Sequence, residues 1–146
     1  GKLEQMNIIK DICACKSNSD LILLHDKLTR QLYRRMEQQA YINKFNVDYS
    51  PPPLVGTDTI IPVTNGLDLI KEGKEQRNCV ATYHNDIVKR EYYVYRVLAP
   101  ERATLGLILA YGQKPKLDQL YLKRNKEVSD MTSKSVHSWL TRFILK

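Results

Sequence analysis

The fold is decided by the stretch EGKEQRNCVATYHNDIVKREYYVYRVLAPERAT, residues 72–104, which joins helical segments to an aromatic strand. Gly73 is expected to close a short helix, because glycine favours the residue after a helix C-terminus. A second helix is expected over about residues 74–90, from its helical spacing of apolar residues. Tyr92 to Leu98 alternates in the two-residue period of a strand, and Pro100 to Arg102 forms a turn.

Further segments around this stretch predict the rest of the sheet. Thr59–Val63, Ala103–Tyr111 and Lys116–Leu122 are β-prone, and short turn-rich connections favour antiparallel neighbours. Apolar residues at helical spacing around Trp139 predict a last helix in which this tryptophan is a packing anchor. The expected fold class is α+β, with helices on a three- to four-stranded antiparallel meander and a C-terminal helix closing it.

The N-terminal part is expected to be a helical arm. A short helix is expected over about residues 2–15 and a longer one over about residues 20–44. The longer helix carries one apolar stripe, made of Leu21, Leu24, Leu28, Leu32 and Met36. Pro51–Pro53 cannot be helical, so residues 1–49 are interpreted as the arm and residues 50–146 as the α+β domain.

Composition limits the classes of function. The 146 residues carry a formal net charge of +7 and are 42% hydrophobic, as in a folded basic protein. No apolar run reaches the roughly 20 residues that span a bilayer. No membrane partner is therefore expected. Three cysteines without a secretion signal argue against a disulfide framework and for a reducing cytoplasm. The positive charge suits nucleic acid, although a protein can be basic without such a partner.

Two groups of basic residues are candidates for nucleic-acid contact. One is a predicted hairpin edge that includes an interleaved tyrosine, and the other is a helical ridge. Their members are Lys114, Lys116, Lys123, Arg124 and Lys126 on the edge, and Lys27, Arg30 and Arg34 on the ridge. The alternatives are lysines that protect a sheet edge from aggregation and a solvated helix face.

Cys79 is the first candidate for a nucleophile. A predicted position early in a helix beside Arg77 would stabilise a thiolate. His84 is the nearest histidine in the sequence, but five residues along a helix turn it away from Cys79. Cys13 and Cys15 have C-x-C spacing without a paired C-x-x-C or H-x-x-x-H. The sequence therefore predicts no metal site and no cofactor.

Polar side chains on three consecutive strands are expected to share one sheet face. Arg96, Thr104 and Gln119 lie on these strands, and Asn125 follows the last of them. A covering helix would add Cys79 and Tyr83. A guanidinium, a hydroxyl and amides suit a phosphate or a nucleobase edge. The alternative is a buried hydrogen-bond network that fixes helix on sheet.

Four motifs together resemble the PcfJ-like proteins, named for a component of a bacterial conjugative-plasmid operon. The motifs are PPPLVGTDTIIPVT (51–64), EGKEQRNCVATY (72–83), YVYRVLAPERATLGL (93–107) and DQLYLKRNKEV (118–128), followed by Trp139-Leu140. The resemblance covers about residues 50–140. Residues of the family pattern correspond to Asn78, Cys79, Val80, Tyr83, Arg96, Thr104, Leu105, Gln119 and Asn125.

The sequence departs from this pattern at three places. Arg90 replaces a usual glycine, Gly106 replaces a usual Glu or Ser, and Lys123-Arg124 replaces a glycine-containing stretch. The resemblance implies a bacterial or mobile-element origin and a cytoplasmic setting near DNA-processing genes. It implies no settled biochemical activity.

Three functions remain in view. The leading one is a nucleic-acid-associated binding module of a bacterial mobile element or defence system. The second is an enzyme that acts on a nucleotide or nucleic-acid substrate through a polar pocket around Cys79 and Arg96. The third is a protein-interaction domain that docks through the Leu21–Met36 helix.

Overall fold

The structure is a computed structural model that describes residues 19–38 and 41–144. Its elements run in the order α2 (Ser19–Gln38), α3 (Tyr41–Phe45), β1 (Ile60–Pro62), α4 (Gly66–Gln76), η1 (Val80–Tyr83), α5 (His84–Val88), β2 (Tyr92–Val97), β3 (Ala103–Ile108), β4 (Lys116–Leu122), η2 (Lys123–Asn125) and α6 (Asp130–Ile144). The predicted α+β class is confirmed. The helix expected over residues 2–15 lies outside the described residues.

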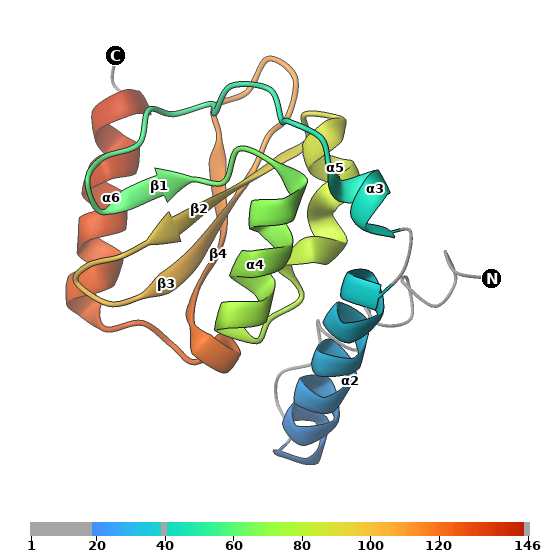
Figure 1. The fold of residues 1–146 in the computed structure, drawn as a ribbon. Coiled ribbons are helices and arrows are strands. Elements are labelled where there is room, and N and C mark those ends of the chain that lie inside the picture. The colour runs from blue at the N-terminus through green and yellow to red at the C-terminus, as the bar shows by residue number, and fades with distance from the viewer. Residues whose placement is uncertain (1–18, 39–40, 145–146) are drawn as a thin grey trace.

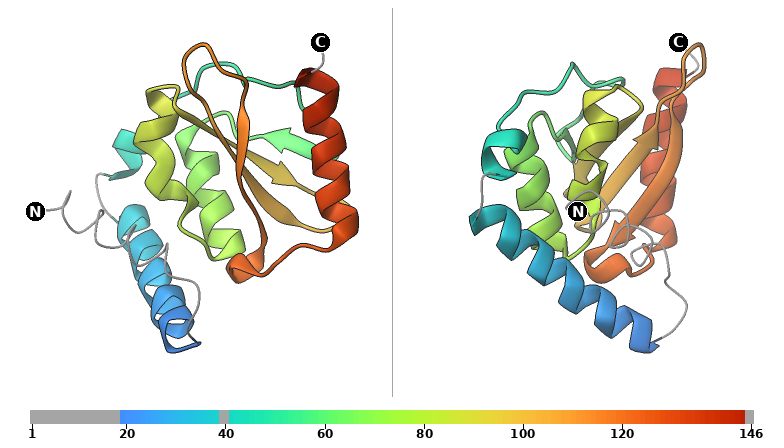
Figure 2. Two further views of the ribbon diagram at one scale, coloured as in Figure 1. Left: turned by 180° about the vertical axis from the view of Figure 1, so that it is seen from behind. Right: turned by 90° about the vertical axis from the view of Figure 1, so that its right-hand side faces the viewer.

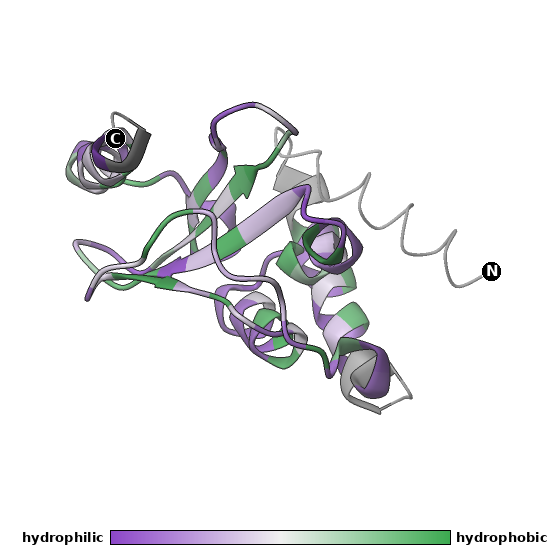
Figure 3. Ribbon diagram, turned by 90° about the horizontal axis from the view of Figure 1, so that it is seen from above, coloured by the Kyte–Doolittle hydropathy of each residue, from purple (hydrophilic) through white to green (hydrophobic). Residues whose placement is uncertain are grey.

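The four strands form one antiparallel sheet in the order β1-β2-β3-β4. All four expected strands are present, and β4 has the predicted bounds. Helix α6 covers one face of the sheet, while α4, η1 and α5 cover the other (Figures 1 and 2). Seen from above, α6 lies near the C-terminal label and the sheet separates it from the other helices (Figure 3).

The face toward α6 contains the aromatic core. Tyr95 and Trp139 are 0% and 2% exposed and pack edge to face at a centroid distance of 4.9 Å. The Trp139 indole donates a hydrogen bond to the Val55 carbonyl at 2.9 Å, and the Tyr95 hydroxyl donates to the Leu54 carbonyl at 2.8 Å. These bonds hold the segment after the three prolines on the core. The predicted role of Trp139 as a packing anchor is confirmed.

The opposite face carries the polar strand residues. Arg96 pairs with Thr104 across β2 and β3, and Gly106 pairs with Gln119 across β3 and β4. Thr104 and Gly106 are two residues apart on β3, so all four residues lie on one face of the sheet. The aromatic ring of Tyr92 covers Gly106, where an added Cβ would overlap the Tyr92 hydroxyl. The register thus places the polar side chains together on this face. It also explains the glycine at position 106, because the Tyr92 ring leaves no room there for a side chain.

Helix α4 differs from the prediction, because it continues through Gly73 to Gln76 and is capped by Arg77 at φ 48°. Gly73 is buried inside the helix, where a Cβ would overlap the hydroxyl of Tyr33 from α2. The glycine therefore serves close helix packing, and its assignment as a helix stop was wrong. The N-cap of α4 is Asn65, whose side chain accepts a hydrogen bond from the Asp68 amide at 2.8 Å.

A single helix over residues 74–90 was also wrong, because the chain turns after Gln76 and resumes as η1 and α5. Asn78 accepts a hydrogen bond from the Val80 amide at 3.0 Å, and Thr82 donates its hydroxyl to the Cys79 carbonyl at 2.6 Å. Such local side-chain bonds compete with a continuous helix. This break turns Cys79 toward α2.

The expected helix over residues 20–44 is resolved as α2 and α3, with residues 39–40 between them not described. Leu32 and Tyr33 of α2 are 5% and 3% exposed and form a second core cluster with Phe45, Ile70 and Ala81. Helix α2 therefore packs on the domain through its own apolar side chains. In the described part of the chain, no helix is long and apolar enough to cross a membrane.

Candidate functional site

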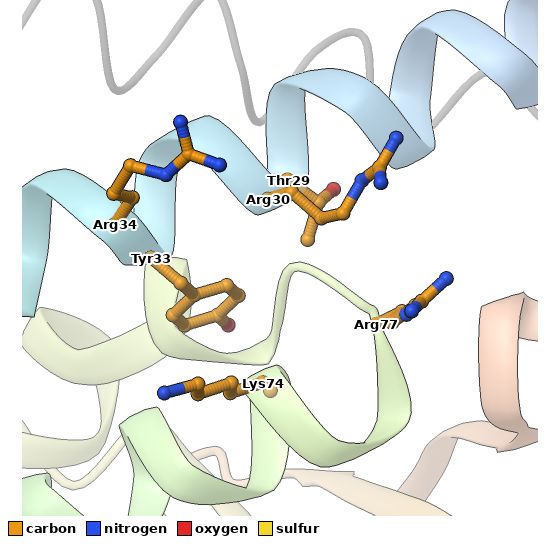
Figure 4. A pocket seen from close by; sticks show the side chains of 7 residues that line it. Thr29, Arg30, Tyr33, Arg34, Lys74 and Arg77 are labelled. Carbon is orange, nitrogen blue, oxygen red and sulfur yellow. The ribbon is translucent and has the colours of Figure 1, made fainter.

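A basic pocket lies between α2 and α4. Its volume is about 300 Å³, and its lining residues are Thr29, Arg30, Tyr33, Arg34, Gly73, Lys74 and Arg77. We call this cavity the α2/α4 pocket. Figure 4 shows that its side chains come from both helices, with the Tyr33 ring extending from α2 toward α4.

Tyr33 is the fixed wall of the α2/α4 pocket. Its hydroxyl accepts a hydrogen bond from the Ala81 amide at 3.0 Å, and its ring lies over Gly73. Burial raises the pKa of Tyr33 well above its ordinary value, and the charge of Glu72 acts in the same direction. The phenol therefore stays neutral near pH 7 and contributes shape to the pocket without charge.

Charge in the α2/α4 pocket has one sign, because its lining includes four cationic side chains and no carboxylate. Arg30 pairs with Asp26 one helical turn away, at 3.5 Å. Among the described residues, no ion pair joins Arg34 or Arg77 to a carboxylate. Lys74 and Arg77 lie at the C-terminal end of α4, where cations are favoured in any helix. Arg34 belongs to α2, so the preference for cations at the C-terminal end of α4 does not explain its place in the pocket lining.

The helical ridge predicted from the sequence contributes to this pocket in part. Arg30 and Arg34 line the cavity, whereas Lys27 is exposed and does not. Lys74 and Arg77 were missed, because the helical periodicity of α2 and α4 does not show that the two helices pack side by side. The available signal was Gly73 within a helical pattern, since an interior glycine often marks a close helix contact.

The predicted hairpin edge does not form one basic cluster. Lys114 and Lys116 lie at the start of β4, while Lys123, Arg124 and Lys126 follow its end. A strand of this length is roughly 20 Å long, so the two ends are separate surfaces. Strand β4 is at the edge of the sheet, as the protective alternative requires. Arg124 also lies 3.8 Å from Asp26 of α2.

Two of the predicted polar residues converge on a buried carboxylate that sequence reasoning missed. Glu72 of α4 is 1% exposed and is held by the Arg102 guanidinium through two hydrogen bonds. Thr104 donates its hydroxyl to Glu72 at 2.6 Å, and the Arg96 guanidinium lies 3.6 Å away. The Asn78 amide donates to Thr104 at 3.2 Å. This group, the Glu72 network, ties α4 to β2 and β3.

A second group joins η1 to the sheet. The Gln119 amide donates to the Tyr83 hydroxyl at 2.7 Å, and the Tyr92 hydroxyl donates to Asp118 at 2.8 Å. The rings of Tyr83 and Tyr92 stack at 4.3 Å. A register shift after Gly106 leaves Asp118 between two paired residues of β4. Burial, reinforced by the charge of Asp118, raises the pKa of Tyr83, so the phenol is neutral near pH 7.

A third group surrounds Cys79. Its sulfur lies 3.3 Å from Nε2 of His25 and 3.6 Å from the Thr29 hydroxyl, and it is part of a disulfide. Asn125 reaches the same His25 nitrogen at 3.5 Å. His84 lies elsewhere, bonded through Nδ1 to the Tyr49 hydroxyl at 2.7 Å. The histidine beside Cys79 is therefore one from α2, 54 residues earlier in the chain.

The six predicted pocket residues thus belong to three neighbouring hydrogen-bonded groups. Arg96 and Thr104 join the Glu72 network, Tyr83 contacts Gln119, and Cys79 is connected to Asn125 through His25. None of the six lines the α2/α4 pocket. The α2/α4 pocket lies on the other side of α4 from these strands, between α4 and α2 (Figure 1).

Comparison with known proteins gives one match. The family model described as PcfJ-like protein matches residues 2–136. No curated protein and no solved structure matches the chain significantly. The suspected resemblance is thereby confirmed, and it extends through α2 as well as the α+β part.

Proposed function

The chain belongs to the PcfJ-like protein family, and we propose that it is a nucleic-acid-associated binding module of a bacterial mobile element or defence system. In this proposal the phosphate backbone contacts the α2/α4 pocket. The single observation that carries the proposal is the gathering of Arg30, Arg34, Lys74 and Arg77 around one cavity.

The chemistry of these four side chains matches phosphate. A guanidinium presents its N–H donors in a planar fork that bonds two phosphate oxygens at once, and a lysine ammonium adds a point charge. A cavity of about 300 Å³ is at the small end of ligand pockets, which suits phosphate and sugar better than a large cofactor. Binding of this kind gives affinity that depends weakly on base sequence.

Stacking of bases on Tyr33 should contribute little to the affinity of the α2/α4 pocket for nucleic acid. It is 3% exposed and its hydroxyl is already bonded to the chain at Ala81. An aromatic side chain that reads bases must offer its ring face to them. The proposal therefore predicts electrostatic backbone binding, with similar affinity for oligonucleotides of different sequence.

The test compares oligonucleotide binding by variants of equal net charge, measured by fluorescence anisotropy at low salt. The pocket variant carries Arg34→Gln, Lys74→Gln and Arg77→Gln. The matched control removes the same charge from the C-cap of α5 and from α6, with Lys89→Gln, Lys134→Gln and Arg142→Gln, all at exposed positions. We expect the pocket variant to bind about tenfold more weakly or worse, a loss of about 1.4 kcal/mol, and the control to lose much less.

Two results would count against the proposal. Equal losses in both variants would mean that net charge alone attracts nucleic acid. Absence of binding by the parent chain to single-stranded and duplex oligonucleotides at low salt would remove the function itself. A further variant with Lys114, Lys116, Lys123 and Lys126 changed to Gln tests the β4 surfaces separately.

The other two functions have weaker support. An enzyme around Cys79 and Arg96 requires a free thiol and an available guanidinium, whereas the Cys79 sulfur is buried and Arg96 faces Glu72. Docking of a partner through the Leu21–Met36 helix requires an exposed apolar stripe. Leu32 of that stripe is used by the second core cluster, and the side chains of Leu21 and Met36 lie outside the described residues.

A further inference from the structure

The α2/α4 pocket has a neutral floor and a charged rim. Its buried lining residues are Thr29, Tyr33 and Gly73. Its cationic lining residues are the exposed Arg30, Arg34 and Lys74 and the half-buried Arg77. Figure 4 shows these four cationic side chains spread around the Tyr33 ring. An anion that enters the cavity therefore meets a closed, uncharged floor, with positive charge around its mouth.

The closed floor determines which kind of phosphate can enter. A phosphodiester within a strand carries a sugar on two of its oxygens, so it can lie across the mouth of such a cavity without passing into it. A terminal phosphomonoester carries one sugar and keeps three free oxygens, so it can point inward. Of the two groups, only the terminal one makes use of a cavity of about 300 Å³ with a single opening direction away from the buried floor.

The charge of the pocket also favours a terminal phosphate. A phosphodiester carries one negative charge, whereas a terminal phosphomonoester carries about −1.5 to −2 near pH 7. Arg30 shares its charge with Asp26 at 3.5 Å, but among the described residues no ion pair joins Arg34 or Arg77 to a carboxylate. Each guanidinium can bond two phosphate oxygens, and three free oxygens supply acceptors for more than one guanidinium.

The backbone of Arg77 points to a role for its side chain. Arg77 caps α4 with φ 48° and ψ 56°, in the left-handed region. Glycine is the usual residue at such a cap, because it has no Cβ. Strained residues of this kind are concentrated at binding sites, where the side chain offsets the cost of the conformation. Here the side chain is a guanidinium that lines the α2/α4 pocket.

One further arginine lies next to the pocket. Asp26 approaches Nε of Arg30 at 3.5 Å with one oxygen and Nε of Arg124 in η2 at 3.8 Å with the other. Arg124 is therefore separated from the rim of the pocket by a single carboxylate. Its side chain is 49% exposed, so it can contact a phosphate farther along a strand whose end occupies the pocket.

We propose that the α2/α4 pocket binds the terminal phosphate of a nucleic-acid strand, with Arg34 and Arg77 bonded to the free phosphate oxygens and Arg124 beside the adjoining backbone. This inference rests on the proposed function and names the part of the nucleic acid that the pocket takes. Recognition is non-covalent, and it depends on the strand end and not on base sequence.

The test measures fluorescence anisotropy of one short single-stranded oligonucleotide, labelled at an internal base, in three forms. The forms carry a 5′-phosphate, a 3′-phosphate or hydroxyl groups at both ends. We expect at least one phosphorylated form to bind at least about fivefold more tightly than the hydroxyl form. Arg34→Gln should remove this preference, whereas Arg124→Gln should weaken all three forms by a similar factor and keep the preference.

Two glycine variants separate the side chain of Arg77 from its backbone. Arg77→Gly should abolish the preference for a phosphorylated end without lowering the melting temperature, because glycine adopts the left-handed conformation freely. Arg90→Gly is the matched control, since Arg90 has φ 63° and lies outside the pocket lining. Its preference should equal that of the parent chain. A preference that survives both Arg34→Gln and Arg77→Gly would overturn the proposal.

The outcomes distinguish this proposal from the proposed function. Equal binding of the three forms would overturn end recognition and leave backbone binding in place. Binding of phosphorylated forms alone would support end recognition and contradict binding through internal phosphates. Absence of binding by all three would refute both. Competition by a nucleoside 5′-monophosphate as strong as that by the phosphorylated oligonucleotide would mean that the pocket takes a free nucleotide, and would overturn the assignment to strand ends.

Discussion

Loss of Arg102 is expected to destabilise the fold far more than loss of Arg96. Both guanidiniums approach Glu72, whose side chain is fully buried, but the two contacts differ. Arg102 makes two hydrogen bonds to the carboxylate, with its side chain 29% exposed. Arg96 lies 3.6 Å away with its side chain 38% exposed, an ion pair of the weak, solvent-screened kind.

The magnitudes follow from what each change leaves behind. Arg102→Met keeps the apolar stem but leaves Glu72 with the Thr104 hydroxyl and the more distant Arg96. Removing one partner of a buried pair costs about 3–5 kcal/mol, and the remaining guanidinium reduces this to about 2–3 kcal/mol here. Arg96→Met leaves the Arg102 bonds intact and should cost under about 1 kcal/mol. At about 3 °C per kcal/mol, the melting temperature should fall by about 6–9 °C for Arg102→Met and by less than about 3 °C for Arg96→Met.

Thermal and urea unfolding followed by circular dichroism measure both variants under the same conditions. The reasoning requires a clear difference, with Arg102→Met the less stable protein. Equal losses would mean that the carboxylate is shared evenly and that the Glu72 network is arranged differently. A larger loss for Arg96→Met would refute the assignment of Arg102 as the main partner.

Three more changes test other contacts. Gly73→Ala should displace the Tyr33 ring, lower the free energy of unfolding by about 1–3 kcal/mol and weaken oligonucleotide binding. Unchanged oligonucleotide affinity would mean that the position of Tyr33 does not affect binding in the α2/α4 pocket. Gly106→Ala should push the Tyr92 hydroxyl from Asp118 at a similar cost, seen as a lower melting temperature and altered near-ultraviolet dichroism. Burial lowers the pKa of His84 below its ordinary value of 6.5, so the unfolded chain takes up the proton more readily. Stability should therefore be complete above about pH 6.5 and fall as the pH drops through that value, and His84→Asn should flatten this dependence in urea titrations from about pH 5 to 8.

The strands and the last helix were predictable from the sequence because their patterns are local. The alternation from Tyr92 to Leu98 and the apolar spacing around Trp139 each report burial on one side of a single element. Turn-rich connections then limit the order of neighbouring strands. The antiparallel sheet and the anchoring tryptophan follow from these signals without knowledge of distant contacts.

The failures around Gly73 and the candidate sites have a shared physical cause. A helix-interior glycine and a helix stop look alike until the partner is known, and here Tyr33 is the partner. The same holds for the approach of His25 to Cys79 and for the addition of Lys74 to the arginines of α2. These contacts join residues far apart in the chain, and their sequence periodicity carries no information about the pairing.

The departures from the family pattern gain a physical meaning from the backbone. Arg90, where the pattern has glycine, has φ 63°, and Arg124 in the other altered stretch has φ 62°. Glycine is the usual residue in this left-handed region because it has no Cβ. This chain therefore places arginine, at Arg90 and Arg124, in a backbone conformation that usually favours glycine.

The salt dependence of oligonucleotide affinity is the most direct measurement of phosphate binding in the α2/α4 pocket. Each phosphate contact contributes about 0.7 to the slope of log affinity against log salt for single strands, and about 0.9 for duplex, through displaced counterions. The variant with Arg34, Lys74 and Arg77 changed to Gln should show a slope shallower by at least one such contact, while the control at Lys89, Lys134 and Arg142 keeps the parent slope. A pocket variant whose slope equals that of the parent would contradict phosphate binding between α2 and α4.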